Sequence, residues 1–305
     1  MDLDVRRLRV LREVALRGTI TAAAQSLGYT PSAISQQLSA LERESGTVLL
    51  ERVGRRVRLT EAGQLLVSRT EPVLAALEEA KAALEESRDT IAGDLRVAAS
   101  GSVAAALVIP VAAGLTSGHP GLRVTVHERE TDEGLRDLRL GALDAVVAHE
   151  YDHDRLRPEP EIVRVELFAE DMLVAAPAGR FADPVNLADL KGEVWAAEPP
   201  TSTCGRAARA ACRAAGFEPD IRYVSSEAGG VLAAVQAGAV SLLPRLGLAR
   251  PPAGVDALPV AGHGARRIVF AAHRHGSASR PGIALLLARL RDAARRLECP
   301  AAVAG

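Results

Sequence analysis

The amino-acid sequence predicts a multidomain protein of the α plus α/β class, in which a small helical module is joined by a long helix to a larger α/β domain. Three observations predict this class. Residues 19–41 contain two short helical patterns separated by a polar break, and an arginine-rich segment follows them. From Gly93 onward, strand patterns alternate with helix patterns, which is typical of βαβ units. A chain of 305 residues with 48% hydrophobic residues can bury more than one core.

The segment from Thr19 to Leu41 predicts two helices joined by a tight turn. Small residues open the first helix and allow the second to cross close to it. Gly28 can take the positive φ that ends a helix. Thr30 then suits an N-cap, and Pro31 suits the first helical position, where a missing N–H has no cost. The predicted buried stripe of the second helix consists of Ala33, Ile34, Leu38 and Leu41.

The outer face of the second helix carries short polar side chains, namely Ser32, Ser35, Gln36 and Ser39. A helix that enters the major groove of DNA needs such a face. Taken alone, two amphipathic helices with a glycine turn are also typical of an ordinary helical subdomain. The next segment favours the first interpretation.

Residues 49–60 alternate basic and apolar side chains around Gly54, which predicts a small β-hairpin. Such a hairpin would lie beside the second helix as a wing. Its arginines are then placed to meet the phosphates of a DNA backbone. These arginines are Arg52, Arg55, Arg56 and Arg58. The first 60 residues therefore predict a winged helix-turn-helix.

Charge is segregated along the chain, although the formal net charge is only −1. Residues 1–60 hold ten arginines and six acidic residues, an excess of four positive charges. Residues 61–90 hold three basic and seven acidic residues, and the rest of the chain is nearly balanced. The positive excess lies on the module that is expected to bind DNA, as phosphate binding requires. A solvated charged surface can show a similar small excess.

Residues 60–88 predict one long helix that begins at a capping sequence. Apolar residues recur in it at spacings of four, three and four, which is typical of a coiled-coil seam. A helix with one apolar stripe must bury that stripe, either on its own chain or against a second copy. Because no globular domain adjoins this segment in the sequence, the pattern favours a dimer. Pro72 removes one helical hydrogen bond and is placed to kink the helix. The seam residues are Val73, Leu77, Ala80 and Leu84.

From Gly93 onward the pattern predicts two runs of alternating strands and helices and a mainly parallel sheet. The first run has strands at 95–99, 122–128 and 145–148 and helices at 103–115 and 133–140. The second has strands at 172–176, 194–197, 221–224 and 240–243 and helices at 203–215 and 229–237, before a strand at 267–272 and a helix at 281–297. The chain is expected to cross between the two halves near 164–167 and 265–268. Such halves place a ligand cleft at their junction.

Two hydroxyl-rich segments stand at matching positions, each just before a predicted helix. Backbone N–H groups at a helix start, together with hydroxyl groups, suit a carboxylate or another small anion. Glu227, before a later helix, would disfavour a dianion or bind a donor group. Taken singly, each segment is better explained as a helix N-cap. The two segments are Ser100, Gly101 and Ser102, and Thr201, Ser202 and Thr203.

In its motifs and in the order of its parts, the chain resembles the LysR-type transcriptional regulators. TAAAQSLGYTPSAISQQLSALE at 21–42 and LERVGRRVRLTEAG at 50–63 are very similar to the DNA-binding module of that family. GDLRV at 93–97, HPG at 119–121 and GALDAV at 141–146 match landmarks of its effector domain. The resemblance covers essentially the whole chain. Thr19, Leu50 and Gln36 stand where the family often has Ser, Phe and Arg.

The resemblance implies a winged helix-turn-helix at 1–60, a linker and dimerisation helix at 61–90, and a periplasmic-binding-protein-like effector domain at 91–305. Half I of that domain would comprise 91–163 and 268–305, and half II would comprise 164–267. The implied partners are double-stranded DNA with an imperfect palindromic operator, a small-molecule effector, and further copies of the chain in a homodimer or homotetramer; no cofactor is implied. We expect DNA contacts from Thr30, Pro31, Ser32, Ser35, Gln36, Arg52, Arg55 and Arg56, and effector contacts from Ser100, Gly101, Ser102, Thr201, Ser202, Thr203 and Glu227.

Cys204 and Cys212 keep a thiol-based redox-sensing regulator open as an alternative, because peroxide-sensing members of the resembled family carry a cysteine pair in a comparable region. Cys204 stands at a predicted helix start, where a thiol pKa is lowered. On an intact helix, about 12 Å of rise separates the two residues, which is beyond disulfide reach. The intervening residues are strong helix formers. Cys212 and Cys299 are expected to pack as small hydrophobic residues.

A small-molecule-binding α/β enzyme is the alternative from another class. His149, Asp152, His153 and Asp154 come closest to the spacing of metal ligands, but a solvated loop before Pro158 explains them better. The sequence contains no nucleophile elbow, P-loop or dinucleotide-binding glycine pattern. We therefore expect a regulator without a metal site.

The sequence shows no signal-peptide pattern and no recognisable membrane span. Its three cysteines are typical of a reducing compartment and do not suggest a disulfide framework. These features predict a cytoplasmic protein without a membrane partner.

Overall fold

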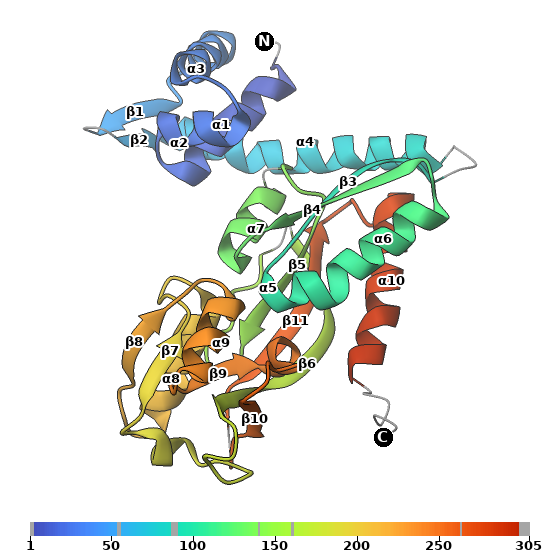
Figure 1. Cartoon of the computed structure of the whole chain (residues 1–305). Coiled ribbons are helices and arrows are strands. Elements are labelled where there is room, and N and C mark those ends of the chain that lie inside the picture. The colour runs from blue at the N-terminus through green and yellow to red at the C-terminus, as the bar shows by residue number, and fades with distance from the viewer. Residues whose placement is uncertain are drawn as a thin grey trace. The chain divides into compact units, whose positions relative to one another are not determined.

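The computed structural model describes residues 3–53, 56–86, 91–139, 141–159, 162–262 and 264–298. Arg55 and Cys299 lie outside the described residues. The chain divides into two compact units, Met1–Ser87 and Arg88–Gly305 (Figure 1). Each unit has its own hydrophobic core.

The first unit consists of four helices and a β-hairpin. The helices are α1 (Val5–Arg17), α2 (Ile20–Leu27), α3 (Pro31–Ser45) and α4 (Glu61–Glu86), and the hairpin joins β1 (Leu50–Val53) to β2 (Arg56–Leu59). The hairpin strands are antiparallel, with Leu50 opposite Leu59. The three short helices bury one apolar cluster, in which Leu11, Ile34 and Leu41 are fully buried.

The turn between α2 and α3 has the predicted geometry. Gly28 ends α2 with a φ of 69°. The Thr30 side chain accepts a hydrogen bond from the Ala33 N–H at 3.2 Å, and Pro31 occupies the first turn of α3. In the predicted stripe, Ile34, Leu38 and Leu41 are buried, and Ala33 is half-buried. The predicted helix-turn-helix and hairpin are therefore confirmed.

The long helix α4 begins where the hairpin ends. Thr60 Oγ1 accepts a hydrogen bond from the Gly63 N–H at 3.1 Å. A Cβ at Gly63 would lie 2.2 Å from the Leu49 carbonyl oxygen, so only glycine allows the start of α4 to pack this closely on the hairpin. The helix then continues through Pro72 without a break.

Half I of the second unit is built on a sheet of mixed direction. Its strands are β3 (Gly93–Ala99), β4 (Leu122–Glu128), β5 (Ala145–Tyr151), β6 (Ile162–Pro177) and β11 (Arg266–Arg274). Strand β3 runs parallel to β4 and β5, whereas β11 runs antiparallel to β5 and β6. The expectation of a mainly parallel sheet was wrong, because the two strands that connect the halves lie side by side in opposite directions.

Helices cover both faces of this sheet (Figure 1). One face carries a continuous helix made of α5 (Gly101–Val103), a π-helical turn (Ala104–Val108) and α6 (Ile109–Gly118), together with α10 (Pro281–Glu298). The other face carries α7 (Thr131–Arg139), whose Leu135 and Leu138 pack against Phe270 of β11.

Within the described residues, one helix, Gly101–Gly118, is long enough and apolar enough to cross a membrane, judged by length and composition alone. No membrane span was expected from the sequence. Val103, Leu107, Val108 and Leu115 of this helix are buried in the core of half I. We therefore interpret it as a core helix, because a buried helix of a globular domain satisfies the same criterion.

Half II contains two short sheets and two helices. Strand β7 (Val194–Ala197) pairs with β8 (Asp220–Val224), while β9 (Ser241–Pro244) and β10 (Val255–Pro259) pair with the end of β6. The helices are α8 (Thr203–Ala214) and α9 (Ala228–Gln236), and short 3-10 turns lie at Leu187–Leu190 and Arg245–Leu248. Trp195 is fully buried at the centre of this core.

Strand β6 runs through both halves. Its residues from Ile162 to Asp171 pair with β11, those from Leu173 to Pro177 pair with β10, and those from Met172 to Ala175 pair with β9. The change of sheet therefore falls after Asp171, whereas the sequence placed it near residue 164. Arg164 and Glu166 alternate with Val163, Val165 and Leu167, which is a strand pattern that the prediction of a crossing at 164–167 did not use.

Candidate DNA-binding face and ligand junction

The exposed face of α3 carries the side chains expected to contact DNA bases. Pro31, Ser32 and Gln36 are exposed, and Ser35 is half-buried. The Ser32 hydroxyl lies 2.9 Å from Thr30 Oγ1, and the Ser35 hydroxyl donates to the Pro31 carbonyl at 3.0 Å. Both serine hydroxyls thus interact with the start of their own helix, whereas Gln36 extends its amide from the exposed surface.

The hairpin has the geometry of a wing. Arg55 and the side chains of Arg52 and Arg56 lie outside the described residues. Arg58 is described, and its Nε donates to Glu51 Oε1 at 2.7 Å across the hairpin. The neighbouring carboxylate therefore offsets the charge of Arg58.

The predicted seam of α4 is exposed in the single chain. Val73, Leu77 and Leu84 have exposed fractions of 47%, 36% and 68%. Leu74, beside the seam, is buried instead, and an ion pair between Arg12 and Glu71 links α1 to α4. The first unit therefore uses one side of α4 for its own core and leaves the seam uncovered.

In the second unit, His149 of β5 connects the starts of α5 and α8. Its Nδ1 lies 3.3 Å from Ser100 Oγ, and its Nε2 lies 2.7 Å from Thr203 Oγ1. Thr131 holds the backbone of His149, since its hydroxyl donates to the His149 carbonyl at 3.1 Å and accepts from its N–H at 3.2 Å. The two predicted hydroxyl segments are therefore brought together by one imidazole.

His149 is buried and neutral. Burial, together with the positive charges of Arg267 and Arg206, lowers the pKa of its imidazole to about 3. A neutral imidazole carries one donor and one acceptor nitrogen, so one of its hydroxyl partners donates and the other accepts. The sequence placed His149 in a solvated loop, which was wrong because β5 continues to Tyr151 and buries both residues.

A buried ion pair supports the same junction. Arg267 of β11 pairs with Glu170 of β6, and its Nε donates to Glu170 Oε1 at 2.8 Å. Its Nη1 and Nη2 both donate to Ser102 Oγ at 3.2 Å. The two strands that connect the halves thus position a guanidinium at the start of α5. Sequence reasoning missed Arg267, because only the register of β6 and β11 reveals its partner.

The other predicted effector residues are placed differently. Ser202 caps α8, and its Oγ accepts from the Gly205 N–H at 2.9 Å. Thr201 and Gly101 are exposed. Glu227 is exposed before α9, and within the described residues no hydrogen bond joins it to the His149 group. We therefore define the junction cluster as Ser100, Ser102, Thr131, His149, Tyr151, Thr203, Cys204 and Arg267.

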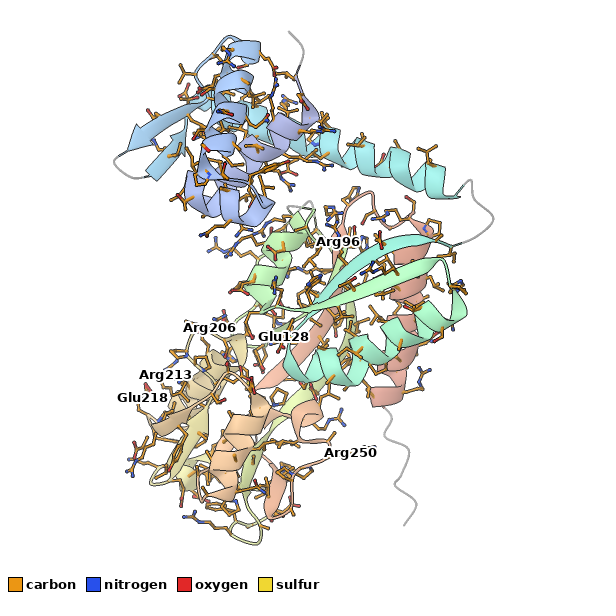
Figure 2. All side chains as sticks on the ribbon, turned by 45° about the horizontal axis from the view of Figure 1, so that its top comes forward. Arg96, Glu128, Arg206, Arg213, Glu218 and Arg250 are labelled. Carbon is orange, nitrogen blue, oxygen red and sulfur yellow. The ribbon has the colours of Figure 1, made fainter. Side chains whose placement is uncertain are left out.

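Arg206 of α8 adds a second link between the halves (Figure 2). Its Nε lies 3.3 Å from Asp154, and its Nη2 lies 3.9 Å from Asp132. Asp154 is therefore an ion-pair partner in this structure. The described residues include no group of three or more His, Cys, Asp or Glu side chains placed to hold a metal ion.

The cysteines are buried and their thiols are protonated. Neither Cys204 nor Cys212 is in a disulfide. Burial raises the pKa of Cys204 far above its usual value, with a further contribution from the charge of Glu198. Burial also raises the pKa of Cys212 to about 12, assisted by Glu218. The expected lowering at the α8 start was wrong, because loss of solvation outweighs the effect of the helix terminus.

A groove of about 520 Å³ lies between α6 and α10, on the outer face of half I. Leu107, Val111, Leu115 and Leu297 supply apolar walls, and the charged residues of the lining are Arg289, Asp292 and Arg296. The described lining of this groove contains none of the predicted effector residues. The groove and the junction cluster are therefore separate features.

Comparison with known families identifies the two units. Residues 5–64 match the bacterial regulatory helix-turn-helix protein of the lysR family, and residues 88–295 match the LysR substrate binding domain. The chain belongs to the LysR family. Because that family consists of transcriptional regulators, the enzyme alternative is excluded.

Individual LysR relatives resemble the chain to different extents. A probable RuBisCO transcriptional regulator of Cyanophora paradoxa is 32% identical over 57% of this chain and 53% of the relative, so the chain spans about half the length of that protein. The DNA-binding transcriptional dual regulator OxyR of Escherichia coli strain K12 is 29% identical over 90% of each chain. A solved structure of full-length CbnR complexed with its target DNA has 25% identity and a TM-score of 0.55, and covers 96% of this chain and 100% of that one.

Proposed function

We propose that this LysR-family chain is a cytoplasmic, sequence-specific transcription factor that binds double-stranded DNA under the control of a small molecule. The observation that carries the proposal is the joint match of residues 5–64 and 88–295 to the two domains of that family. The exposed Gln36 on α3 supports base recognition, because a recognition helix reads base edges with such side chains. The positive excess of residues 1–60 supports binding to phosphates.

Self-association belongs to this proposal. The exposed seam of α4 supports pairing of the linker helix, residues 61–90, with that of a second copy. Contacts between effector domains, residues 91–305, would complete a homodimer or homotetramer. Two winged modules, residues 1–60 of each copy, would then read the two half-sites of an imperfect palindrome.

The effector is proposed to bind where half I and half II meet. The convergence of Ser100, Ser102 and Thr203 on His149 and Arg267 supports this place. A ligand there would change the contact between the halves, and the oligomer would transmit that change to the spacing of the DNA modules. The two hydroxyl-rich helix starts support an anionic effector.

A thiol-based sensor is the second candidate. Its support is the 29% identity to OxyR over most of the chain and the position of Cys204 in the first turn of α8. The burial and raised pKa of Cys204 oppose it, because a thiolate is the reactive form. We therefore favour non-covalent effector binding.

The proposal is tested by DNA binding of the full chain. We expect a specific shift of the promoter fragment upstream of its own gene, with an affinity that falls steeply as salt is raised. A scrambled fragment of the same length is the control. No difference between the two fragments at any salt concentration below physiological contradicts the proposal. A DNase footprint that changes when a ligand binds at the junction supports the proposal that an effector controls DNA binding.

A further inference from the structure

The groove between α6 and α10 has a floor of small residues. They recur at every fourth position of the chain and line the groove together. A Cβ placed on Gly114 or Gly118 would meet no atom within 4 Å, apart from the backbone of its own helix. The floor extends over about 18 Å, at 1.5 Å of rise per residue. Its residues are Ala106, Pro110, Gly114 and Gly118.

A π-helical turn lies at one end of this floor. It spans Ala104–Val108, and the Ile109 N–H donates to the Ala104 carbonyl five residues back. Pro110 follows it and has no N–H to offer to the preceding turn. Single π-helical turns inside α-helices occur frequently at functional sites. The irregular part of this helix and the floor of the groove therefore coincide.

The walls of the groove are apolar and come from both helices. Leu107, Val111 and Leu115 belong to the buried core of half I, so packing fixes this side of the groove. Leu297 of α10 packs against the same core and supplies the other side (Figure 1). The volume of about 520 Å³ lies within the usual range of small-molecule sites. The groove therefore suits the hydrocarbon part of a ligand.

The rim of the groove on α10 carries a positive excess. Arg289 and Arg296 are exposed and lie about two helical turns apart on one face of α10. Within the part of the chain that the structure describes, neither of them forms an ion pair. Asp292 lies between them, but Arg295 offsets its charge from a distance of 3.9 Å. An anionic group is the complement of such a rim.

We propose that this groove is a second ligand site, which binds an amphipathic carboxylate with a linear hydrocarbon chain. The chain lies along the floor and buries its apolar surface against Leu107 and Leu115. The carboxylate lies at the α10 rim and accepts hydrogen bonds from the guanidinium groups there. The junction cluster shares no residue with this groove, so the proposal does not depend on the effector site.

Three probes separate the contributions of chain and charge. Calorimetric titration of the full chain uses decanoate, decylammonium and acetate at one ionic strength, below the concentrations at which the decyl compounds form micelles. Decanoate should bind, and decylammonium should bind at least about tenfold more weakly because the rim repels it. Acetate should not bind in the same range, because it lacks apolar surface. Decanoate should also raise the unfolding temperature of the effector domain.

Variants of both helices locate the site. Gly114→Leu places a side chain in the open groove and should abolish decanoate binding, and it should fold because leucine is a better helix former than glycine. Ser117→Leu adds the same side chain at an exposed position of α6 outside the lining, and the affinity should stay within about twofold. Arg289→Gln combined with Arg296→Gln should lower the affinity about tenfold. Arg291→Gln, at an exposed position of α10 outside the lining, is the control for this pair.

Three results overturn the proposal. Equal decanoate affinity in Gly114→Leu and Ser117→Leu would place the bound decanoate elsewhere on the chain. Equal affinity for decanoate and decylammonium would show that the rim does not select a negative charge. Absence of decanoate binding, together with weaker self-association of Gly114→Leu in sedimentation velocity, would make a second copy of the chain the occupant of the groove. The promoter shift is measured separately, so failure of this site and failure of the proposed function are distinguishable.

Discussion

His149 Nε2 lies 2.7 Å from Thr203 Oγ1, and this contact joins half I to half II across their boundary. The imidazole is 4% exposed and meets Ser100 at its other nitrogen. Its interactions are therefore with protein groups on both sides, and none of its polar atoms depends on solvent. The start of α8 is therefore held on half I by a buried imidazole.

Replacing His149 with phenylalanine should destabilise the effector domain by about 2–3 kcal/mol, because two buried hydroxyl groups lose a partner. The change should also make the free energy of unfolding fall less steeply as the pH is lowered. Folding keeps the imidazole neutral, with a pKa near 3, while the unfolded chain binds a proton below its ordinary value of 6.5. Its contribution is therefore complete above pH 6.5 and is lost as the pH falls from there toward 3.

Urea unfolding at several pH values measures both effects. His275→Gln is the matched control, because His275 is exposed in the turn that follows β11. The control should have the same free energy of unfolding as the unaltered chain, with the same dependence on pH. A His149 variant with an unchanged slope between pH 6.5 and 4 would show that the imidazole is charged in the folded protein.

Local signals predicted the first unit well. Gly28, Thr30 and Pro31 act through the conformations of single residues, so their roles can be read without knowledge of the rest of the fold. Strands at 122–128 and 194–197 were also predicted with their observed bounds. The first alternates apolar and polar residues, and the second is a short apolar run.

The junction could not be predicted in the same way. The partnership of Arg267 with Glu170 joins residues far apart in sequence and depends on the register of β11 against β6. Strand β10 follows Pro251 and Pro252, which by themselves favour a turn. Tertiary pairing outweighs these local preferences.

Placing a charge on the α4 seam should prevent self-association. Leu77→Glu puts a carboxylate on an apolar stripe that is uncovered in the single chain. If two copies bury this stripe, each loses the burial of one leucine, so the dissociation constant should rise about a hundredfold or more. Sedimentation velocity over a range of concentrations measures the change. Gln64→Glu, at an exposed polar position of the same helix, is the control, and equal sedimentation of both variants would place the interface elsewhere.

The buried thiols should react slowly in the folded chain. Since burial holds Cys204 and Cys212 in the protonated form, alkylation by iodoacetamide should be at least about a hundredfold slower in buffer than in urea. Treatment with hydrogen peroxide should leave promoter binding unchanged, and Cys204→Ser should bind the promoter as the unaltered chain does. A peroxide-dependent change that Cys204→Ser abolishes would establish the thiol sensor instead.

Gln36 and Arg55 should affect DNA binding in different ways. Gln36→Ala removes an exposed amide of α3, so discrimination at one position of each half-site should fall by about 1–3 kcal/mol, while binding to other sequences changes little. Arg55→Ala, in the predicted wing, should weaken binding to all sequences and lower the slope of log affinity against log salt by about one. Fluorescence anisotropy with a set of single-substituted operators, repeated at several salt concentrations, separates the two effects. A sequence-dependent loss in Arg55→Ala would assign that arginine to a base, and a uniform loss in Gln36→Ala would assign the amide to the backbone.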